Sequence, residues 1–187
     1  MRILLDEQQL RSGVARLADE IRQQYEGRPL TVIGVLTGSI MLLADLVRQL
    51  NLPLQVGLVQ AKSYVGVATS PGPLTLQLEL LPSIVGRDVL LVDDIYDTGH
   101  TLAALIERLQ TSGAASLRSA VLLRKLGRQE VAYEPDFAAF EIPNQFVVGY
   151  GLDYQDAYRH LPYVAVLEDS DLSSPVSELP FPVSDKA

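Results

Sequence analysis

Two adjacent carboxylates, Asp93 and Asp94, follow the short apolar run of residues 89–92. Such a run can be buried on both faces as a strand of a parallel sheet, and open α/β sheets bind their ligands beyond the carboxyl ends of the strands. Paired carboxylates at that place suit a hard cation or the hydroxyls of a sugar. The pair therefore predicts a site for a metal ion or a sugar.

The segment Asp-Thr-Gly-His-Thr at residues 97–101 comes shortly after this pair and opens a helical pattern. Unpaired backbone amides at a helix N-terminus, the helix dipole and the hydroxyls of Thr98 and Thr101 suit a phosphate dianion. Gly99 has no side chain, so the backbone can approach the phosphate closely. Together with the acid pair, this segment has the groups needed to bind a phosphorylated sugar.

Other folds carry similar acids, and the residues named so far leave them open. A buried strand followed by N-capping residues needs no ligand, and nucleotide hydrolases and receiver domains also use acids at strand ends. The chain has no Gly-x-x-x-x-Gly-Lys-Ser/Thr loop, and residues 149–151 lack the third glycine of the dinucleotide fingerprint. A receiver domain should have its acid pair near the first strand, which here ends at residues 37–39. These features weaken the hydrolase, dehydrogenase and receiver interpretations.

The composition of the whole chain limits its partners. A length of 187 residues with 48% hydrophobic and 20% charged residues is that of one ordinary globular domain. The net charge of −8 argues against binding to nucleic acid, although local cations can still hold a small anionic ligand. The absence of cysteine excludes disulfides, and His100 and His160 alone make a poor transition-metal site.

The distribution of charge along the chain favours a cytoplasmic protein that does not enter a membrane. The first residues reach Asp6 too early to form the core of a signal peptide. No stretch of about 18 residues is free of charge, so we expect no membrane span.

The first two thirds of the chain alternate between strand and helix patterns. Asp6 and Gln9 fit a capping box at the start of the first helix. The expected elements are a helix over 6–25, strands over 30–36 and 54–61, a helix over 41–50, strand patterns over 74–80, 88–92 and 117–123, and a helix from 101 to before Gly113. This alternation predicts an α/β fold with a mostly parallel central sheet flanked by helices.

The remaining segments are shorter or richer in turn residues. Gly, Ser, Thr and Pro indicate a flexible flap over about 63–75. Short apolar pieces alternate with polar turns at 137–142, 146–148 and 164–167. They predict a small hood subdomain over about 137–168, to which the N-terminal segment contributes. We therefore expect one domain over residues 1–168 and a loose tail over 169–187.

Several of these segments resemble the type I phosphoribosyltransferases. Residues 89–101 resemble the thirteen-residue phosphoribosyl diphosphate signature of that family, and residues 140–154 and 158–163 resemble its hypoxanthine-guanine branch. The resemblance covers roughly residues 30–167. It implies the type I phosphoribosyltransferase fold and a purine salvage reaction with Mg²⁺. In that reaction 5-phosphoribose passes from phosphoribosyl diphosphate to N9 of hypoxanthine or guanine, giving IMP or GMP and pyrophosphate.

The same resemblance implies roles on the ribose side of the site. Asp97 would be the acid/base residue at N7 of the purine, and its plainer alternative is an N-cap. Asp93 and Asp94 would hold the ribose hydroxyls and one Mg²⁺. Asp153 would help to bind a second Mg²⁺ through pyrophosphate, where the alternative is a surface turn. The 5-phosphate would be bound by the loop residues Thr98, Gly99, His100 and Thr101.

On the base side, Lys125 would reach the exocyclic oxygen of the purine, a contact that favours 6-oxopurines over adenine. Phe146 would stack on the purine ring, and the backbone of Val147 would bond its edge. The plainer alternatives are a solvated lysine at a strand end and a phenylalanine of the core.

The resemblance also covers the pyrophosphate and a lid. Arg159, otherwise a surface arginine, would grip pyrophosphate through its planar guanidinium, with Gly38 beside it. Ser63 and Tyr64 match a lid that would close and exclude water. The chain departs from the family pattern at Thr37, where many members have a basic residue.

Two further departures leave the expected chemistry in place. Asp93 replaces the more usual glutamate, and His100 stands where lysine or leucine can occur. The alternatives to a hypoxanthine-guanine enzyme are a transferase that prefers xanthine or uracil and a regulatory RNA-binding relative of the uracil enzymes. Asp97 and the negative net charge argue against the regulator. Family members usually form dimers or tetramers, so we expect a homo-oligomer.

Overall fold

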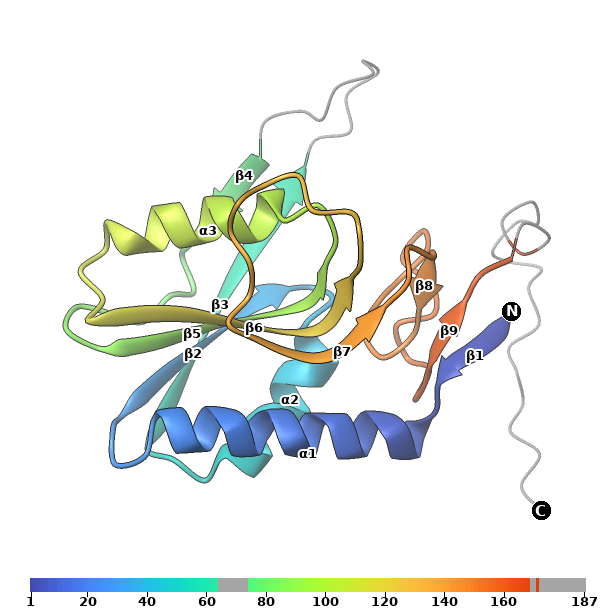
Figure 1. Cartoon of the computed structure of the whole chain (residues 1–187). Coiled ribbons are helices and arrows are strands. Elements are labelled where there is room, and N and C mark those ends of the chain that lie inside the picture. The colour runs from blue at the N-terminus through green and yellow to red at the C-terminus, as the bar shows by residue number, and fades with distance from the viewer. Residues whose placement is uncertain (64–73, 169–170, 172–187) are drawn as a thin grey trace.

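The computed structural model describes residues 1–63, 74–168 and 171. Tyr64, most of the flap expected over 63–75, and all of the expected tail except Asp171 lie outside the described residues. Within the described ranges the chain forms two sheets and three helices (Figure 1).

The larger sheet has the strand order β4-β3-β2-β5-β6-β7 (Figure 1). Its strands are β2 (Leu30–Leu36), β3 (Leu54–Ser63), β4 (Leu74–Gln77), β5 (Asp88–Tyr96), β6 (Ser116–Lys125) and β7 (Phe137–Ile142). Every neighbouring pair is parallel except β3 and β4, which are antiparallel. The mostly parallel sheet expected from the sequence is thus confirmed.

Strand β5 is longer than the predicted strand over 88–92. It continues through the acid pair because Asp93, Ile95 and Tyr96 keep their pairing with β6. Leu90 and Val92 contribute to the core on one face of the sheet, whereas Val89 and Leu91 contribute to the core on the other. Successive side chains of a strand point to opposite faces, so this strand is buried on both and ends at the edge where ligands bind.

The helices cover both faces of the larger sheet. They are α1 (Glu7–Gln24), α2 (Ile40–Leu50) and α3 (His100–Gln110). In Figure 1, α1 and α2 lie on one face and α3 on the other. The capping box of α1 is confirmed, since the Gln9 amide donates to Asp6 Oδ1 over 2.8 Å and the Asp6 amide donates to Gln9 Oε1 over 2.9 Å. The box fixes where α1 begins.

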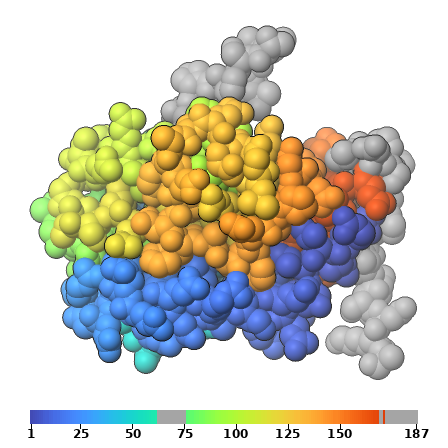
Figure 2. Space-filling view, in the orientation of Figure 1, coloured from blue at the N-terminus to red at the C-terminus, as the bar shows by residue number. Residues whose placement is uncertain are grey.

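Helix α1 packs closely against β7. An added Cβ at Gly13 would lie 2.0 Å from Cζ of Phe140, so the small residue lets the helix approach the strand. The Arg16 guanidinium lies 5.8 Å from the centre of the Phe140 ring and donates to the carbonyl of Ala139. Figure 2 shows the N-terminal residues as a continuous band beneath the residues around β7.

The smaller sheet joins the N-terminal segment to the last third of the described chain. Strands β1 (Arg2–Leu5), β9 (Val164–Val166) and β8 (Val147–Val148) pair antiparallel in the order β1-β9-β8 (Figure 1). Strand β1 could not be predicted from the sequence, because four residues are too few for a two-residue alternation to be recognised and the partner lies far along the chain.

The three helices of the described residues are also too short or too polar to span a membrane.

Candidate active site

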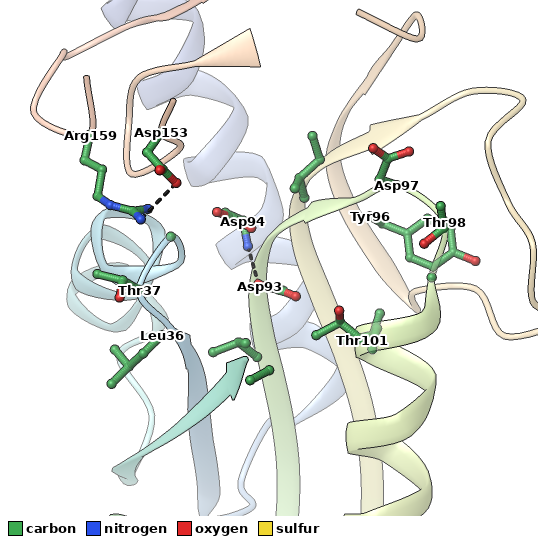
Figure 3. A pocket seen from close by; sticks show the side chains of 16 residues that line it. Leu36, Thr37, Asp93, Asp94, Tyr96, Asp97, Thr98, Thr101, Asp153 and Arg159 are labelled. Carbon is green, nitrogen blue, oxygen red and sulfur yellow. Dashed lines mark hydrogen bonds and ion pairs between the residues drawn. The ribbon is translucent and has the colours of Figure 1, made fainter. Parts of the chain in front are cut away.

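A cavity of about 310 Å³ lies at the carboxyl ends of β2 and β5 (Figure 3). Its walls come from the loop after β2, from the end of β5 through the start of α3, and from the turns between β8 and β9. The predicted site residues in its lining are Gly38, Asp93, Asp94, Asp97, Thr98, Gly99, Thr101, Asp153 and Arg159. The structure thus brings together the residues expected to bind ribose, its phosphate and pyrophosphate.

The acid pair lies in the middle of the cavity, as Figure 3 shows. Asp93 is only 8% exposed, and its Oδ1 accepts a hydrogen bond of 2.9 Å from the backbone amide of Asp94. Burial raises the pKa of both carboxyl groups, and the neighbouring charge of Asp94 raises the pKa of Asp93 further. Two neighbouring carboxylates are unfavourable at such a place, and the charge of Arg159 offsets this only in part at Asp94, so the pair is suited to bind a cation or hydroxyl donors.

The loop before α3 has the geometry expected of a phosphate site. Gly99 is the N-cap of α3 with φ +91°, a conformation that favours glycine. An added Cβ there would lie 2.5 Å from Val131 and 2.8 Å from the Tyr96 ring, so no larger residue fits. Thr98 and Thr101 line the cavity beside the first amides of the helix. A phosphate bound here would meet amides and hydroxyls together.

Asp97 is held between two cations. Its Oδ2 accepts from Lys125 Nζ over 2.8 Å, and its Oδ1 accepts from Arg128 Nε over 2.9 Å. Partial burial acts to raise the pKa of Asp97, but the hydrogen bonds and charges of Lys125 and Arg128 outweigh it, so the pKa lies below its usual value. The alternative role as an N-cap is wrong, because Gly99 holds that position without a side-chain capping bond.

The loop after β2 is fitted closely to the rest of the site. The cis peptide bond between Leu36 and Thr37 precedes Gly38, and all three residues line the cavity. An added Cβ at Gly38 would lie 1.6 Å from Oδ2 of Asp94. Gly151, with φ +100°, packs so closely that its added Cβ would lie 2.0 Å from the carbonyl oxygen of Gly38. Two glycines therefore allow the acid pair, this loop and the turns after β8 to meet.

Arg159 closes the opposite side of the cavity and lies beside Asp153 in Figure 3. Its Nη2 is 2.9 Å from Oδ1 of Asp153 and 3.1 Å from Oδ1 of Asp156, and its Nη1 donates to the carbonyl of Gly151 over 2.8 Å. The surface-arginine and surface-turn alternatives are therefore incomplete descriptions of Arg159 and Asp153. The two residues form an ion pair at the wall of the cavity, facing the acid pair.

The residues expected on the base side lie outside the cavity lining. Lys125 is 8% exposed at the end of β6 and reaches the site through its ion pair with Asp97. Phe146 is 46% exposed and meets Tyr154 edge to face, with ring centres 5.7 Å apart, so it is not a core phenylalanine. Val147 is buried and pairs with Val166 in the smaller sheet.

The other expected residues are placed as follows. The His100 side chain points to Glu130, with 3.0 Å between Nε2 and Oε2, and is absent from the cavity lining. Ser63 pairs through its backbone with Leu74 of β4, and Tyr64 lies outside the described residues. Arg128 could not be found from the sequence, since an arginine in a loop has no spacing that relates it to Asp97.

The comparisons with known proteins agree with this geometry. Residues 2–155 match the family model described as phosphoribosyl transferase domain. A hypoxanthine-guanine phosphoribosyltransferase of Lactococcus lactis is 39% identical over 167 residues, which are 89% of this chain and 91% of that protein. A solved structure of a Trypanosoma cruzi hypoxanthine phosphoribosyltransferase superimposes with a TM-score of 0.86 at 38% identity, covering 92% of this chain and 98% of the other.

Longer proteins also match. The bifunctional protein TilS/HprT of Listeria innocua is 37% identical over 167 residues, and the match spans 89% of this chain but 26% of that protein. The chain therefore corresponds to about a quarter of the length of those bifunctional relatives. From the match to the family model and the identity to relatives of similar length, the chain belongs to the phosphoribosyltransferase family and has its type I fold.

Proposed function

We propose that the chain transfers 5-phosphoribose from phosphoribosyl diphosphate to N9 of hypoxanthine or guanine, giving IMP or GMP and pyrophosphate. The observation that carries this proposal is the single cavity in which the acid pair, the phosphate loop and Asp97 meet, with Lys125 bound to Asp97. The names of the relatives, hypoxanthine-guanine and hypoxanthine phosphoribosyltransferase, support the same reaction. The activity is one of purine salvage.

The ribose phosphate is held by the end of β5 and by the loop that leads from it into α3. Asp93 and Asp94 accept hydrogen bonds from the ribose hydroxyls, and Thr98, Thr101 and the amides at the start of α3 bind the 5-phosphate. The pyrophosphate lies toward Arg159 and the amide of Gly38. In the reaction the bond between N9 and C1 of the ribose forms while the bond between C1 and the pyrophosphate oxygen breaks.

The acidic residues of the cavity fit Mg²⁺ shared with the substrate. In the ranges that the structure describes, no group of three His, Cys, Asp or Glu residues could hold a metal alone. Mg²⁺ keeps several waters and is often bound by one or two carboxylates together with substrate phosphate. Asp93 and Asp94 would hold one ion and Asp153 would help to hold a second. Bound there, Mg²⁺ supplies charge neutralisation for the leaving pyrophosphate.

The base is recognised and deprotonated by residues around Asp97. Because its pKa is lowered, Asp97 is a carboxylate at neutral pH and can accept the proton from N7 as N9 becomes bonded to ribose. Lys125 donates to the exocyclic oxygen, and the exposed ring of Phe146 stacks on the purine. Strand β8 is an edge strand of the described smaller sheet, which leaves one side of the backbone near Val147 for the edge of the base.

The organisation around the site follows the same proposal. Residues 1–168 form one catalytic domain, the smaller sheet and its turns serve as a hood over the base, and residues about 63–75, including Ser63 and Tyr64, act as a lid. The chain works as a cytoplasmic homo-oligomer, a dimer or tetramer, that binds neither nucleic acid nor membrane. A light-scattering mass equal to one chain would contradict the oligomer.

The experiment that tests the function is an assay with a panel of bases. The chain is supplied with phosphoribosyl diphosphate and Mg²⁺ and offered hypoxanthine, guanine, xanthine, adenine and uracil separately, and nucleotide and pyrophosphate are measured. We expect products from hypoxanthine or guanine. Product from xanthine or uracil alone would identify the related transferases instead, and no nucleotide from any base would favour the regulatory relative.

A further inference from the structure

Arg128 gives Asp97 a second cation that the proposed reaction does not yet use. Its Nε is 2.9 Å from Oδ1 of Asp97, while Lys125 Nζ is 2.8 Å from Oδ2. Each carboxylate oxygen therefore has its own positive partner. The side chains are exposed to different degrees, with Arg128 at 40%, Asp97 at 34% and Lys125 at 10%.

The turn that carries Arg128 is tied to the site at both ends. The amide of Leu126 donates to the carbonyl of Ile142 in β7 over 2.9 Å, and the amide of Glu130 donates to the carbonyl of Thr98 over 3.0 Å. Gly127, between them, has φ +72°, which lets the chain reverse after β6. The second of these bonds connects the turn to the loop of residues 97–99 that leads into α3. Arg128 is thus held at a fixed position relative to Asp97.

In the proposed reaction, one cation binds the exocyclic oxygen of the base while the carboxylate of Asp97 still needs a positive partner. When Lys125 moves from Oδ2 to the exocyclic oxygen of the base, Oδ2 becomes available to N7. Without another partner, the carboxylate would lose its counterion at that moment, and its side chain would be free to rotate. A partly buried carboxylate without a counterion also binds a proton more readily, which would stop it from accepting the proton of N7.

We propose that Arg128 is a positioning residue that keeps Oδ1 of Asp97 while Lys125 leaves Oδ2 for the base. The inference rests on the proposed function and deepens it. The guanidinium is planar and always charged, so it can fix the carboxylate through one oxygen without giving up or taking a proton. Lys125, on a flexible four-carbon chain, is the cation that moves. The orientation of the acid/base residue is then set before and during base binding.

The test compares three variants of the full chain. Arg128→Gln removes the charge, Arg128→Lys restores it without the planar group, and Arg118→Gln is the matched control. Arg118 is 39% exposed and lies 3.8 Å from Asp136, on the same strand as Lys125 but away from the cavity. For each variant, kcat with hypoxanthine, KM for phosphoribosyl diphosphate and the pH profile of kcat are measured.

We expect Arg128→Gln to lower kcat by about 10- to 100-fold, the loss typical of a misplaced catalytic group, with KM for phosphoribosyl diphosphate unchanged. Arg128→Lys should recover part of the loss, and Arg118→Gln should behave as the unaltered chain. The charged groups acting on Asp97 are Lys125 and Arg128, and Glu130 acts on Arg128. Removing one cation should therefore move the acid limb of the pH profile to higher pH.

An unchanged kcat in Arg128→Gln, or an equal loss in Arg118→Gln, would overturn the inference. A second measurement is independent of turnover: the carboxyl carbon of Asp97 is followed by NMR as pH is varied, without substrate. If the unaltered chain makes no nucleotide, the proposed function fails, and this titration still decides the contact. A rise in the Asp97 pKa in Arg128→Gln supports the ion pair on which the positioning role depends, and the absence of a rise contradicts both.

Discussion

The ammonium of Lys125 lies 2.8 Å from Oδ2 of Asp97. Lys125 is expected to donate to the exocyclic oxygen of the base and Asp97 to act at N7, so the two expected base-side residues are bound to each other. A 6-oxopurine can draw Lys125 to its oxygen and so release Oδ2. Adenine offers no acceptor at that place, and Asp97 then keeps its lysine. In the proposed reaction, this ion pair would couple the choice of base to the availability of Asp97 for N7.

The first prediction concerns Asp97→Asn. We expect kcat to fall by about 10²- to 10⁴-fold, because the amide cannot take the N7 proton. The melting temperature should fall by far less than the activity, since the amide oxygen can still accept from one of the two cations, while the amide nitrogen faces the other. Steady-state kinetics and a thermal melt check both parts. A normal kcat would remove Asp97 from the chemistry.

Lys125→Met should relax the choice of base. A hydrogen bond to a charged group contributes about 1.5–3 kcal/mol, so the ratio of kcat/KM for hypoxanthine to that for adenine should fall by roughly 10- to 100-fold. The methionine keeps the length and apolar stem of the lysine, which preserves packing at the end of β6. Competition between the two bases measures the ratio directly. An unchanged ratio would show that another group selects the oxygen.

The segment proposed to bind the ribose phosphate could be predicted from the sequence because its parts are local. The strand that contains Asp93 and the helix start after Gly99 are each set by residues within a few positions of one another, as is the capping box at Asp6 in another part of the fold. Arg128 and Gly151 could not be found in this way. Each acts on a residue far along the chain, Asp97 and Gly38, and only the pairing of strands brings those partners together.

Gly151→Ala should weaken both the fold and substrate binding. The new Cβ would lie 2.0 Å from a backbone oxygen of Gly38, and backbone cannot move aside as a side chain can. We expect a destabilisation greater than the cost of a positive φ alone, about 1–2 kcal/mol, and a raised KM for phosphoribosyl diphosphate.

Gly86→Ala is the matched control for this change. Gly86 has φ +68° with nothing within 4 Å of an added Cβ, so only the backbone cost applies. Denaturant unfolding of both variants separates the two contributions. Equal losses of stability would mean that the contact between Gly151 and Gly38 is not tight.

Asp153→Asn should raise the Mg²⁺ concentration needed for half-maximal activity, because a neutral amide is a poorer ligand for a hard cation. Asp156→Asn is the control, since Asp156 also lies against Arg159, at 3.1 Å, but its side chain is 93% exposed. Its Mg²⁺ dependence should match that of the unaltered chain. Titrating Mg²⁺ after chelation gives both curves, and coincident curves for the Asp153 variant and the control would exclude a metal role for Asp153.

The base side was harder to place from sequence than the ribose side. The strand at Val147 is two residues long, and its partner β9 also pairs with the N-terminal strand β1. An exposed phenylalanine such as Phe146 looks like core in a sequence, because hydrophobicity does not reveal which side chains a fold leaves uncovered. Its exposure indicates a binding role only when it is considered together with the ion pair of Lys125 and Asp97.

The most direct test of the account is the stoichiometry of one reaction. The chain is incubated with hypoxanthine, phosphoribosyl diphosphate and Mg²⁺, and IMP and pyrophosphate are quantified together, with Asp97→Asn assayed in parallel. The account predicts equal amounts of IMP and pyrophosphate from the unaltered chain and far slower formation of both by the variant. Release of pyrophosphate without IMP, or equal rates from the two proteins, would contradict it.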